Sequence, residues 1–414
     1  MPRRQGSALL IALVTGTAVL AATVAFASSL LFSGPRATTP SSPGPQGVAR
    51  NPAARAHSTG LWLATWAAAP VVGALEPGPG AGPSPRTIRN VVHTSVGGDA
   101  ARVTLSNLFG THPLLLDQVT VNGFPVTFRG APAVTVAAGR QIVSDPVGVP
   151  VAADTDLVVA LRTPHARGPV TIHPNSHQTS SVEDARGIRR TTDWRYLTAV
   201  DVRGRTAVGT LVALGDSLTA GSGSTTDTNS RWPDVLADRL HGRYAVVNQG
   251  IGGNRLLLDG IGPRALDRFE RDVLGVTGVK TVVIALGVND IQAIPRETDP
   301  ARITDALHDL TMRAHARGLR VIGTTVMPYE GYRAWTPAQN AVRAQVNETI
   351  RAGRIFDQVL DFDRAVLDPS HPDRLQPRYD SGDHVHLTDA GYQRLGSLAD
   401  VADLLRTRPT SDVL

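Results

Sequence analysis

The second half of the chain is constrained most by three short, almost wholly apolar runs at residues 211–214, 244–247 and 281–286, each followed directly by a polar turn that contains glycine. Such runs are typical of strands buried on both faces. Segments with helical patterns alternate with them, at 230–240, 264–273, 299–317, 337–351 and 389–405. Strands that alternate with helices form a parallel sheet covered on both faces. We therefore predict an α/β domain over residues 206–410, with three αβα layers and a parallel sheet. Ser230 is predicted to cap its first long helix.

Several polar residues near these runs are of the types used in nucleophilic catalysis. Ser217 follows the first run, where it would lie at the ligand-binding carboxyl edge of a parallel sheet. A nucleophilic serine needs a base and a group that orients the base, and His386 and Asp383 are the candidates. Because residues three apart on a strand point to opposite faces, these two must lie on a turn to meet. The Gly-x-Ser-x-Gly elbow of ordinary α/β-hydrolases is absent, since Thr219 occupies its last position.

Four sequence blocks together resemble one family of serine esterases and lipases, the SGNH/GDSL hydrolases, over about residues 206–404. The blocks are Gly215-Asp216-Ser217-Leu218, Asn248-Gln249-Gly250-Ile251-Gly252-Gly253-Asn254, Gly287-Val288-Asn289-Asp290 and Asp383-His384-Val385-His386. The resemblance implies a flavodoxin-like domain in which Ser217 is the nucleophile, His386 the base and Asp383 its partner. It also implies an oxyanion hole made of the Ser217 and Gly253 backbone N–H groups and the Asn289 side-chain amide. No cofactor and no metal are expected.

Acidic and histidine residues inside these blocks have other interpretations. Asp216 and Asp290 are expected to hold their loops through local hydrogen bonds, without a catalytic step. His384 lies two residues from His386, and with Asp383 the pair could in principle ligate a metal. No further ligand cluster accompanies them in the sequence. Cysteine is absent from the chain, which excludes disulfides, thiolate metal sites and a thiol nucleophile.

The first half of the chain has a different pattern. Short alternating runs separated by Gly, Pro and Asp predict an all-β domain over residues 60–200, of sandwich or jelly-roll type. Residues 89–109 resemble the β domain that precedes the hydrolase in some secreted SGNH proteins, several of which are linked with deacylation of polysaccharides. Trp62 and Trp66 are interpreted as packing residues, although tryptophan also stacks on sugars. His173 and His177 lie in a polar segment and either line a substrate groove or are simply exposed.

The N-terminal residues are predicted to direct export. Arg3 and Arg4 precede an apolar run at 8–32, so residues 1–32 form either a cleaved signal peptide or a membrane anchor. Both alternatives place the rest of the chain outside the cytoplasm, in an extracellular or cell-surface location. Residues 33–59 are rich in Pro, Ser, Gly and Ala and are predicted to be a disordered linker.

The expected function is that of a secreted or surface-tethered serine esterase. It would act through an acyl-enzyme, with a small-molecule or polysaccharide ester as substrate and short acyl groups on a carbohydrate as the target. A lipase or phospholipase of the same fold is one alternative, but no long apolar lid is visible. A carbohydrate-binding protein with an inactive hydrolase domain is another, although every motif residue is present. Nucleic acid is not expected as a partner, because the arginines behind the net charge of +5 are scattered and aromatic residues make up only 5%.

Overall fold

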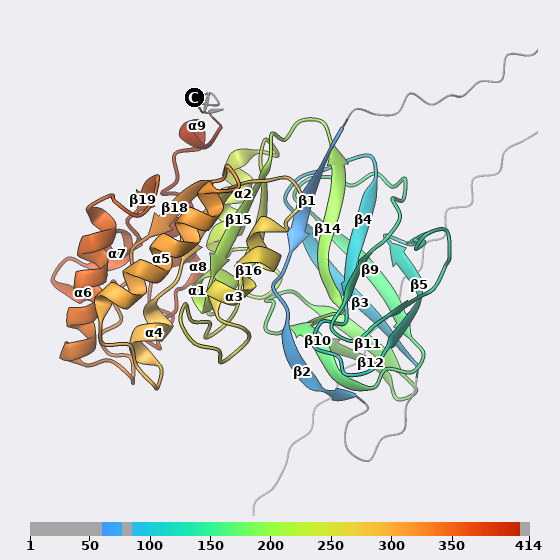
Figure 1. The fold of residues 1–414 in the computed structure, drawn as a ribbon, viewed down its shortest axis with the longest axis horizontal. Coiled ribbons are helices and arrows are strands. Elements are labelled where there is room, and N and C mark those ends of the chain that lie inside the picture. Colours follow the sequence, from blue (N-terminus) through green and yellow to red (C-terminus); the bar gives the residue numbers. More distant parts are fainter. Residues whose placement is uncertain (1–59, 77–84, 406–414) are drawn as a thin grey trace, which may run out of the picture. The chain divides into compact units, whose positions relative to one another are not determined.

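The structure is a computed structural model that describes residues 60–76 and 85–405 (Figure 1). The predicted export segment, 1–32, and the predicted linker, 33–59, lie outside the described residues. Over the described ranges, no helix has the length and apolar character needed to cross a membrane. The described part contains an all-β region, followed by an α/β region that starts at Thr210.

The α/β region is built on a five-stranded parallel sheet with the strand order β16-β15-β17-β18-β19. All six residues of the inner strand β15 are buried, which explains why its sequence is a continuous apolar run rather than an alternating one. The five strands are β15 (Thr210–Gly215), β16 (Ala245–Gly250), β17 (Val279–Ala285), β18 (Arg320–Thr324) and β19 (Gln358–Leu360).

Helices cover both faces of this sheet. One core cluster joins the sheet to α3, α5 and α6, and a second joins its other face to α2, α7 and α8. The predicted three-layer αβα fold with a parallel sheet is therefore confirmed. The helices are α1 (Ser217–Ala220), α2 (Trp232–Leu240), α3 (Ala265–Phe269), α4 (Val288–Gln292), α5 (Pro300–His315), α6 (Pro337–Arg351), α7 (Phe362–Val366), α8 (Asp389–Gly396) and α9 (Val401–Leu404), with a π-helical turn at Glu270–Leu274.

Two helix predictions are wrong in detail. Ser230 does not cap α2; Arg231 takes that position, and the Ser230 hydroxyl donates to Asp389 at 2.5 Å instead. The helix predicted over 389–405 is two helices, because the Asp400 carboxylate accepts from the N–H groups of Ala402 and Asp403 and starts α9 afresh.

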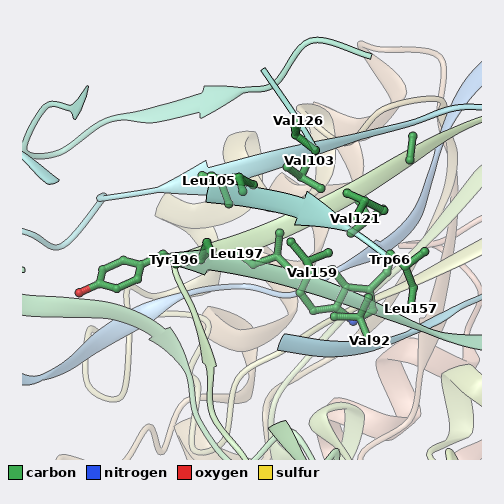
Figure 2. Packing of buried hydrophobic residues seen from close by; sticks show 14 of the residues in the cluster. Trp66, Val92, Val103, Leu105, Val121, Val126, Leu157, Val159, Tyr196 and Leu197 are labelled. Carbon is green, nitrogen blue, oxygen red and sulfur yellow. The ribbon is translucent and has the colours of Figure 1, made fainter. Parts of the chain in front are cut away.

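The all-β region consists of antiparallel sheets around one apolar core, as predicted (Figure 2). Strands β3 and β9 alternate buried and more exposed residues, so Val92 and Leu161 point into the core while their neighbours face outward. The strand orders are β1-β14-β4-β8, β13-β10-β2 and β12-β11-β3-β9-β5-β6, with β7 paired to β5. The strands are β1 (Leu61–Ala67), β2 (Val71–Glu76), β3 (Arg86–Thr94), β4 (Ala101–Ser106), β5 (Leu114–Val121), β6 (Phe124–Pro125), β7 (Val134–Val136), β8 (Gln141–Val143), β9 (Thr155–Thr163), β10 (Gly168–His173), β11 (Ser180–Asp184), β12 (Gly187–Thr191), β13 (Trp194–Arg195) and β14 (Leu197–Gly204).

The two regions share an interface within one compact unit, Ser58–Leu414. Strand β1 lies beside β16, the edge strand of the parallel sheet. Ser95 bridges them, because its hydroxyl donates to the Thr65 carbonyl and accepts from the Val246 N–H at 3.0 Å. The β16 edge is therefore covered, which removes an exposed strand edge. The division into separate domains at 60–200 and 206–410 stays a prediction.

Both tryptophans near the start of the all-β region are held by protein contacts. Trp66 is 6% exposed and packs edge-on against Trp194, with ring centroids 4.8 Å apart. Trp62 lies under the guanidinium of Arg102, 4.7 Å from the ring centroid. Burial of Trp66 fits the packing interpretation, since a buried ring has no face to offer a sugar, while Trp62 is only partly buried and has Arg102 on its ring.

Candidate active site

Ser217 follows the carboxyl end of β15, an inner strand of the parallel sheet. Strand β15 ends at Gly215, Asp216 is the N-cap of α1, and Ser217 is the first residue of that helix. Glycine is required at 215 because a Cβ there would collide with the Thr219 side chain. The Ser217 backbone N–H, at a helix N-terminus, has no acceptor among the described residues. This short turn leaves both the hydroxyl and the N–H of Ser217 available.

His386 and Asp383 form a hydrogen-bonded chain with this serine. The Ser217 Oγ is 2.8 Å from His386 Nε2, and His386 Nδ1 is 2.6 Å from Asp383 Oδ2. Gly382 and His384 have positive φ angles of 104° and 68°, so the segment turns as the spacing requires. The structure thus brings together all three residues of the predicted triad.

Asp383 is held in its ionised form. Partial burial alone would raise its pKa, but the hydrogen bonds from the His386 N–H, the His386 ring and the Val385 N–H outweigh that effect and lower the pKa to about 2. A carboxylate in this position favours the imidazole tautomer with its proton on Nδ1, which leaves Nε2 free to accept the Ser217 proton. The proton positions follow from the hydrogen bonds.

Gly253 lies in the turn after β16, with a φ angle of +72°. A Cβ at this position would be 3.0 Å from Ile261 Cδ1, so both the backbone conformation and the space favour glycine. Its N–H, like that of Ser217, makes no hydrogen bond to a described residue. Gly253 therefore offers an unblocked donor.

Asn289 is the second residue of α4 and is 6% exposed. Its Oδ1 accepts from Gln292 Nε2 at 2.9 Å, which fixes the amide orientation. Its Nδ2 donates to the Asn254 carbonyl at 3.0 Å. An amide nitrogen carries two protons, and the second has no acceptor in the described part of the chain. Asn289 therefore retains one N–H for a substrate oxygen.

Asp216 and Asp290 bind backbone groups of the surrounding loops. Asp216 Oδ1 accepts from the Leu218 N–H at 3.0 Å, and burial raises the pKa of Asp216 to about 7. Asp290 accepts from the N–H groups of Leu256 and Leu257. Burial raises the pKa of Asp290, although these two hydrogen bonds oppose the rise. Both carboxylates have the loop-holding contacts expected from the sequence.

The other histidines do not extend the triad. His173 is 5% exposed, its Nδ1 is 2.8 Å from the Ala69 carbonyl, and burial lowers its pKa to about 4, so it does not line a groove. His177 is half-buried. Its backbone carbonyl accepts a hydrogen bond from the N–H of Asp227, which lies in the loop after α1. His384 pairs with Asp380 at 2.6 Å. Over the described ranges, no group of three or more His, Asp or Glu residues is arranged to hold a metal.

Two cavities differ in their relation to Ser217. The larger, about 480 Å³, lies where the two regions meet and is lined by residues such as Trp66, His93, Arg231 and Asp238. It does not include any of the triad residues. A much smaller one, about 20 Å³, is lined by Asp216 and Leu218, the neighbours of Ser217 in the chain, and by apolar side chains such as Met327, but by no triad residue. Of the two, only the smaller cavity is lined by residues that are adjacent in the chain to Ser217 and Asn289.

Sequence reasoning missed one residue that contacts several parts of this site. Arg268 on α3 is 1% exposed and donates to the Gly215 carbonyl and to Asn254 Oδ1. The available signal was an Arg and an Asp four residues apart, at 268 and 272, on the face of a helix that packs against the sheet. Such a pair is usually read as a surface ion pair, and only the structure reveals its burial.

One comparison with known proteins locates a family match in the second half of the chain. The GDSL-like lipase/acylhydrolase family model matches residues 213–394. No curated protein sequence matches the chain. A solved structure of a G-D-S-L family protein from Desulfitobacterium hafniense DCB-2 is 23% identical and covers 48% of this chain and 99% of its own, with a TM-score of 0.37.

Two further solved structures have enzyme names. An aryl esterase from M. smegmatis is 18% identical, covers 46% of this chain and 95% of its own, and has a TM-score of 0.38. A carbohydrate acetylesterase from Sinorhizobium meliloti is also 18% identical, covers 48% of this chain and 100% of its own, and has a TM-score of 0.38. Each likeness extends over less than half of this chain.

Proposed function

We propose that this protein removes short acyl groups from carbohydrates through an acyl-enzyme on Ser217. Residues 213–394 form a domain of the GDSL-like lipase/acylhydrolase family, so the chain is a hydrolase of ester bonds. The observation that carries the mechanism is the chain of hydrogen bonds from Ser217 to His386 at 2.8 Å and from His386 to Asp383 at 2.6 Å. It couples a nucleophile to a base and the base to an anion.

In the proposed reaction, Ser217 Oγ attacks the ester carbonyl carbon while His386 Nε2 takes the hydroxyl proton. The carbonyl oxygen becomes negative and accepts hydrogen bonds from the Ser217 N–H, the Gly253 N–H and Asn289 Nδ2. When the tetrahedral intermediate collapses, the alcohol leaves with the proton from His386. Water then attacks the acyl-enzyme by the same route, with His386 again as base, and releases the acid.

The proposed preference for short acyl groups rests on the size of the small cavity lined by Asp216 and Leu218, the two neighbours of Ser217 in the chain. Its volume is about 20 Å³, lined by Leu218, Val288, Met327 and other residues. A space of this size admits roughly one water-sized group. The methyl group of an acetyl ester fits such a space, whereas a longer chain would have to displace the lining side chains or lie on the surface.

The exposure of the His386 and Asp383 side chains supports a bulky, polar alcohol as the leaving group of the ester. The side chains of His386 and Asp383 are 24% and 46% exposed. The neighbouring loop over 225–228, which follows α1, is exposed and consists of Thr225, Thr226, Asp227 and Thr228. Hydroxyl and carboxylate groups at this rim suit a sugar better than a lipid. We also propose that the enzyme acts outside the cytoplasm, as the N-terminal sequence predicts.

An ester panel tests this function. We expect hydrolysis of 4-nitrophenyl acetate to exceed that of the butyrate, and that of the decanoate to be negligible. We also expect release of acetate from an acetylated polysaccharide, with the Ser217→Ala protein as the matched control. A preference for the decanoate would favour a lipase instead. Turnover of aryl acetate without release of acetate from any acetylated carbohydrate would reject the carbohydrate as substrate.

A further inference from the structure

Arg268 is the most deeply buried cation near the catalytic serine. Its side chain is fully buried on α3, next to the π-helical turn Glu270–Leu274. Removing a guanidinium from water is costly unless its charge is paired and its N–H groups are all occupied. The partners of Arg268 therefore indicate what this burial achieves.

One partner supplies the opposite charge. Arg268 Nη1 donates to Asp272 Oδ2 at 3.1 Å, and Arg271 also binds Asp272 from the more exposed side. Burial lowers the pKa of Arg268, and the neighbouring Asp272 carboxylate opposes that effect. Asp272 thus stabilises the buried charge, but it has no contact with the triad or with the candidate oxyanion donors.

The other three partners belong to the elements that carry the oxyanion donors. Nη2 donates to the Gly215 carbonyl at 2.9 Å, two residues before Ser217. Nη1 donates to the Gln249 carbonyl at 2.8 Å, near the end of β16. Nε donates to Asn254 Oδ1 at 3.0 Å, next to Gly253. One planar group therefore joins the end of β15 to the glycine turn after β16.

Asn254 extends this connection to the third donor. Its backbone carbonyl accepts from Asn289 Nδ2 at 3.0 Å, while its own Nδ2 donates to the Ile261 and Pro263 carbonyls. Asn254 therefore lies between Arg268 and Asn289. All three elements that supply the candidate donors, at Ser217, Gly253 and Asn289, are within two hydrogen bonds of the same guanidinium.

From these contacts we infer that Arg268 is the positioning residue of the oxyanion hole. Its rigid fork of N–H groups sets the distance between the Ser217 and Gly253 amides and, through Asn254, the position of the Asn289 amide. Oxyanion donors act only when they lie about 2.7–3.1 Å from the developing charge. A displacement of about 1 Å can cost roughly 10²-fold in rate, even when it originates away from the reacting atoms. The inference rests on the proposed function.

Arg343 provides a matched control for a purely structural role. It is also buried, at 4% exposure, and binds Asp363, Asp373 and the Val326 carbonyl. None of these partners belongs to the triad or to the elements that carry the oxyanion donors. An Arg343→Lys change removes buried hydrogen bonds of the same kind without touching the connection through Arg268.

The experiment compares Arg268→Lys with Arg343→Lys in the full chain. A lysine ammonium keeps the charge opposite Asp272, but as a single point of donation it cannot reach three separate acceptors. Both proteins are measured for melting temperature, for kcat and KM on 4-nitrophenyl acetate, and for inhibition by phenylboronic acid. The boronate forms a tetrahedral adduct on the serine and places an oxygen in the oxyanion hole. Rates are normalised to the serine titrated by a phosphonate.

We expect Arg268→Lys to lower kcat by about 10–10²-fold with KM within about threefold, and to raise the boronate Ki by the same factor as it lowers kcat/KM. Arg343→Lys should lower the melting temperature comparably and leave kcat within about threefold. The inference is overturned if the two variants lose kcat equally, if Arg268→Lys keeps wild-type kcat, or if the boronate Ki does not change. If Arg268→Lys does not fold, the neutral pair Arg268→Gln with Asp272→Asn is measured by the same criteria.

The wild-type protein separates this inference from the proposed function. If it hydrolyses no ester, the proposed function fails, whatever the variants do. If it hydrolyses 4-nitrophenyl acetate and Arg268→Lys does so equally well, only the role of Arg268 is rejected.

Discussion

The all-β region and the α/β region both bury a large apolar core, but they differ in the charge that they bury. Within residues 60–76 and 85–204, Asp201 is the only Asp, Glu, Lys or Arg residue that is buried as a whole, and it pairs with Arg102 and Thr277 at the boundary with the α/β region. Within residues 206–405, eight residues of these types are buried: Asp216, Arg231, Arg255, Arg268, Asp272, Asp290, Arg343 and Asp363.

This difference indicates that the α/β region loses more stability to buried charge than the all-β region does. Buried charge is costly even when it is paired, and replacing it by apolar residues often stabilises a protein. Several of the buried charges in the α/β region lie at the carboxyl ends of the strands, around Ser217, where they hold loops in place. We therefore expect changes in the α/β site to affect mainly rate, and changes in the all-β core to affect mainly stability.

The largest expected effect is that of Ser217→Ala. Removing the nucleophile should lower kcat by at least about 10⁴-fold, because only binding and the oxyanion donors remain. The free energy of unfolding should change by less than about 0.5 kcal/mol, since the hydroxyl bonds only His386 and lies at a helix start. Activity is measured with 4-nitrophenyl acetate and stability by urea unfolding. Retention of wild-type turnover would remove Ser217 from the mechanism.

Asp383→Asn should have the next largest effect, about 10³–10⁴-fold in kcat. An amide donates to His386 Nδ1 where the carboxylate accepts, so it favours the wrong imidazole tautomer. Thermal stability and substrate KM should change little, because the loop keeps its backbone hydrogen bonds. The measurement is steady-state kinetics beside circular dichroism. If the Asp383→Asn protein stays within about tenfold of wild-type kcat, the proposed role of Asp383 is contradicted.

Asn289→Ala should lower kcat by about 10²–10³-fold, or roughly 3–4 kcal/mol, with little change in KM, because the lost hydrogen bond strengthens in the transition state. Asn289→Asp should be at least as damaging, since a carboxylate repels the oxyanion. The alternative is that Asn289 only holds the loop through the Asn254 carbonyl. In that case the loss of activity would follow the unfolded fraction, which the melting temperature of the same samples measures.

A core substitution in the all-β region should have the opposite profile. Leu161 on β9 is fully buried, so Leu161→Ala should cost about 2–5 kcal/mol of unfolding free energy through the cavity that it leaves. The kcat per titrated serine should stay within about twofold of wild type. The measurements are urea unfolding and phosphonate titration. A large fall in kcat without a loss of stability would show that the regional division is wrong.

The smallest expected effect is the pH dependence of stability. The contribution of Asp216 in the α/β region and that of His173 in the all-β region change with pH in opposite directions. The pKa of Asp216 is raised by burial to about 7, so its contribution to stability is complete below about pH 4 and is lost as pH rises to about 7. The pKa of His173 is lowered by burial to about 4, so its contribution is complete above about pH 6.5 and is lost as pH falls to about 4.

Two variants isolate these contributions. Asp216→Asn should remove the loss of stability toward neutral pH, and His173→Phe should remove the loss toward acid pH. Melting temperatures between about pH 4 and 8 provide the test. If either variant keeps the pH dependence of the wild-type protein, the corresponding burial effect is refuted.

Local patterns in the sequence determined the type and order of the elements. Apolar runs such as 211–214 predict buried parallel strands, and the alternation in the first half predicts antiparallel sheets. The four motif blocks identify the family and predict the candidate catalytic residues, among them Ser217, Gly253, Asn289 and His386. These predictions depend on neighbours along the chain, and a residue pattern records such neighbours directly. The fold class and the family are confirmed, while the catalytic roles remain predictions.

Contacts between distant residues were decided only by the tertiary structure. Arg268 resembles a surface ion pair with Asp272 until the sheet places the Gly215, Gln249 and Asn254 oxygens around it. Ser230 has the residue type of a helix cap, but Asp389, which is 159 residues away, captures its hydroxyl. A polar side chain bonds whichever partner the fold brings nearest, and the separation of those partners along the chain carries no periodic signal.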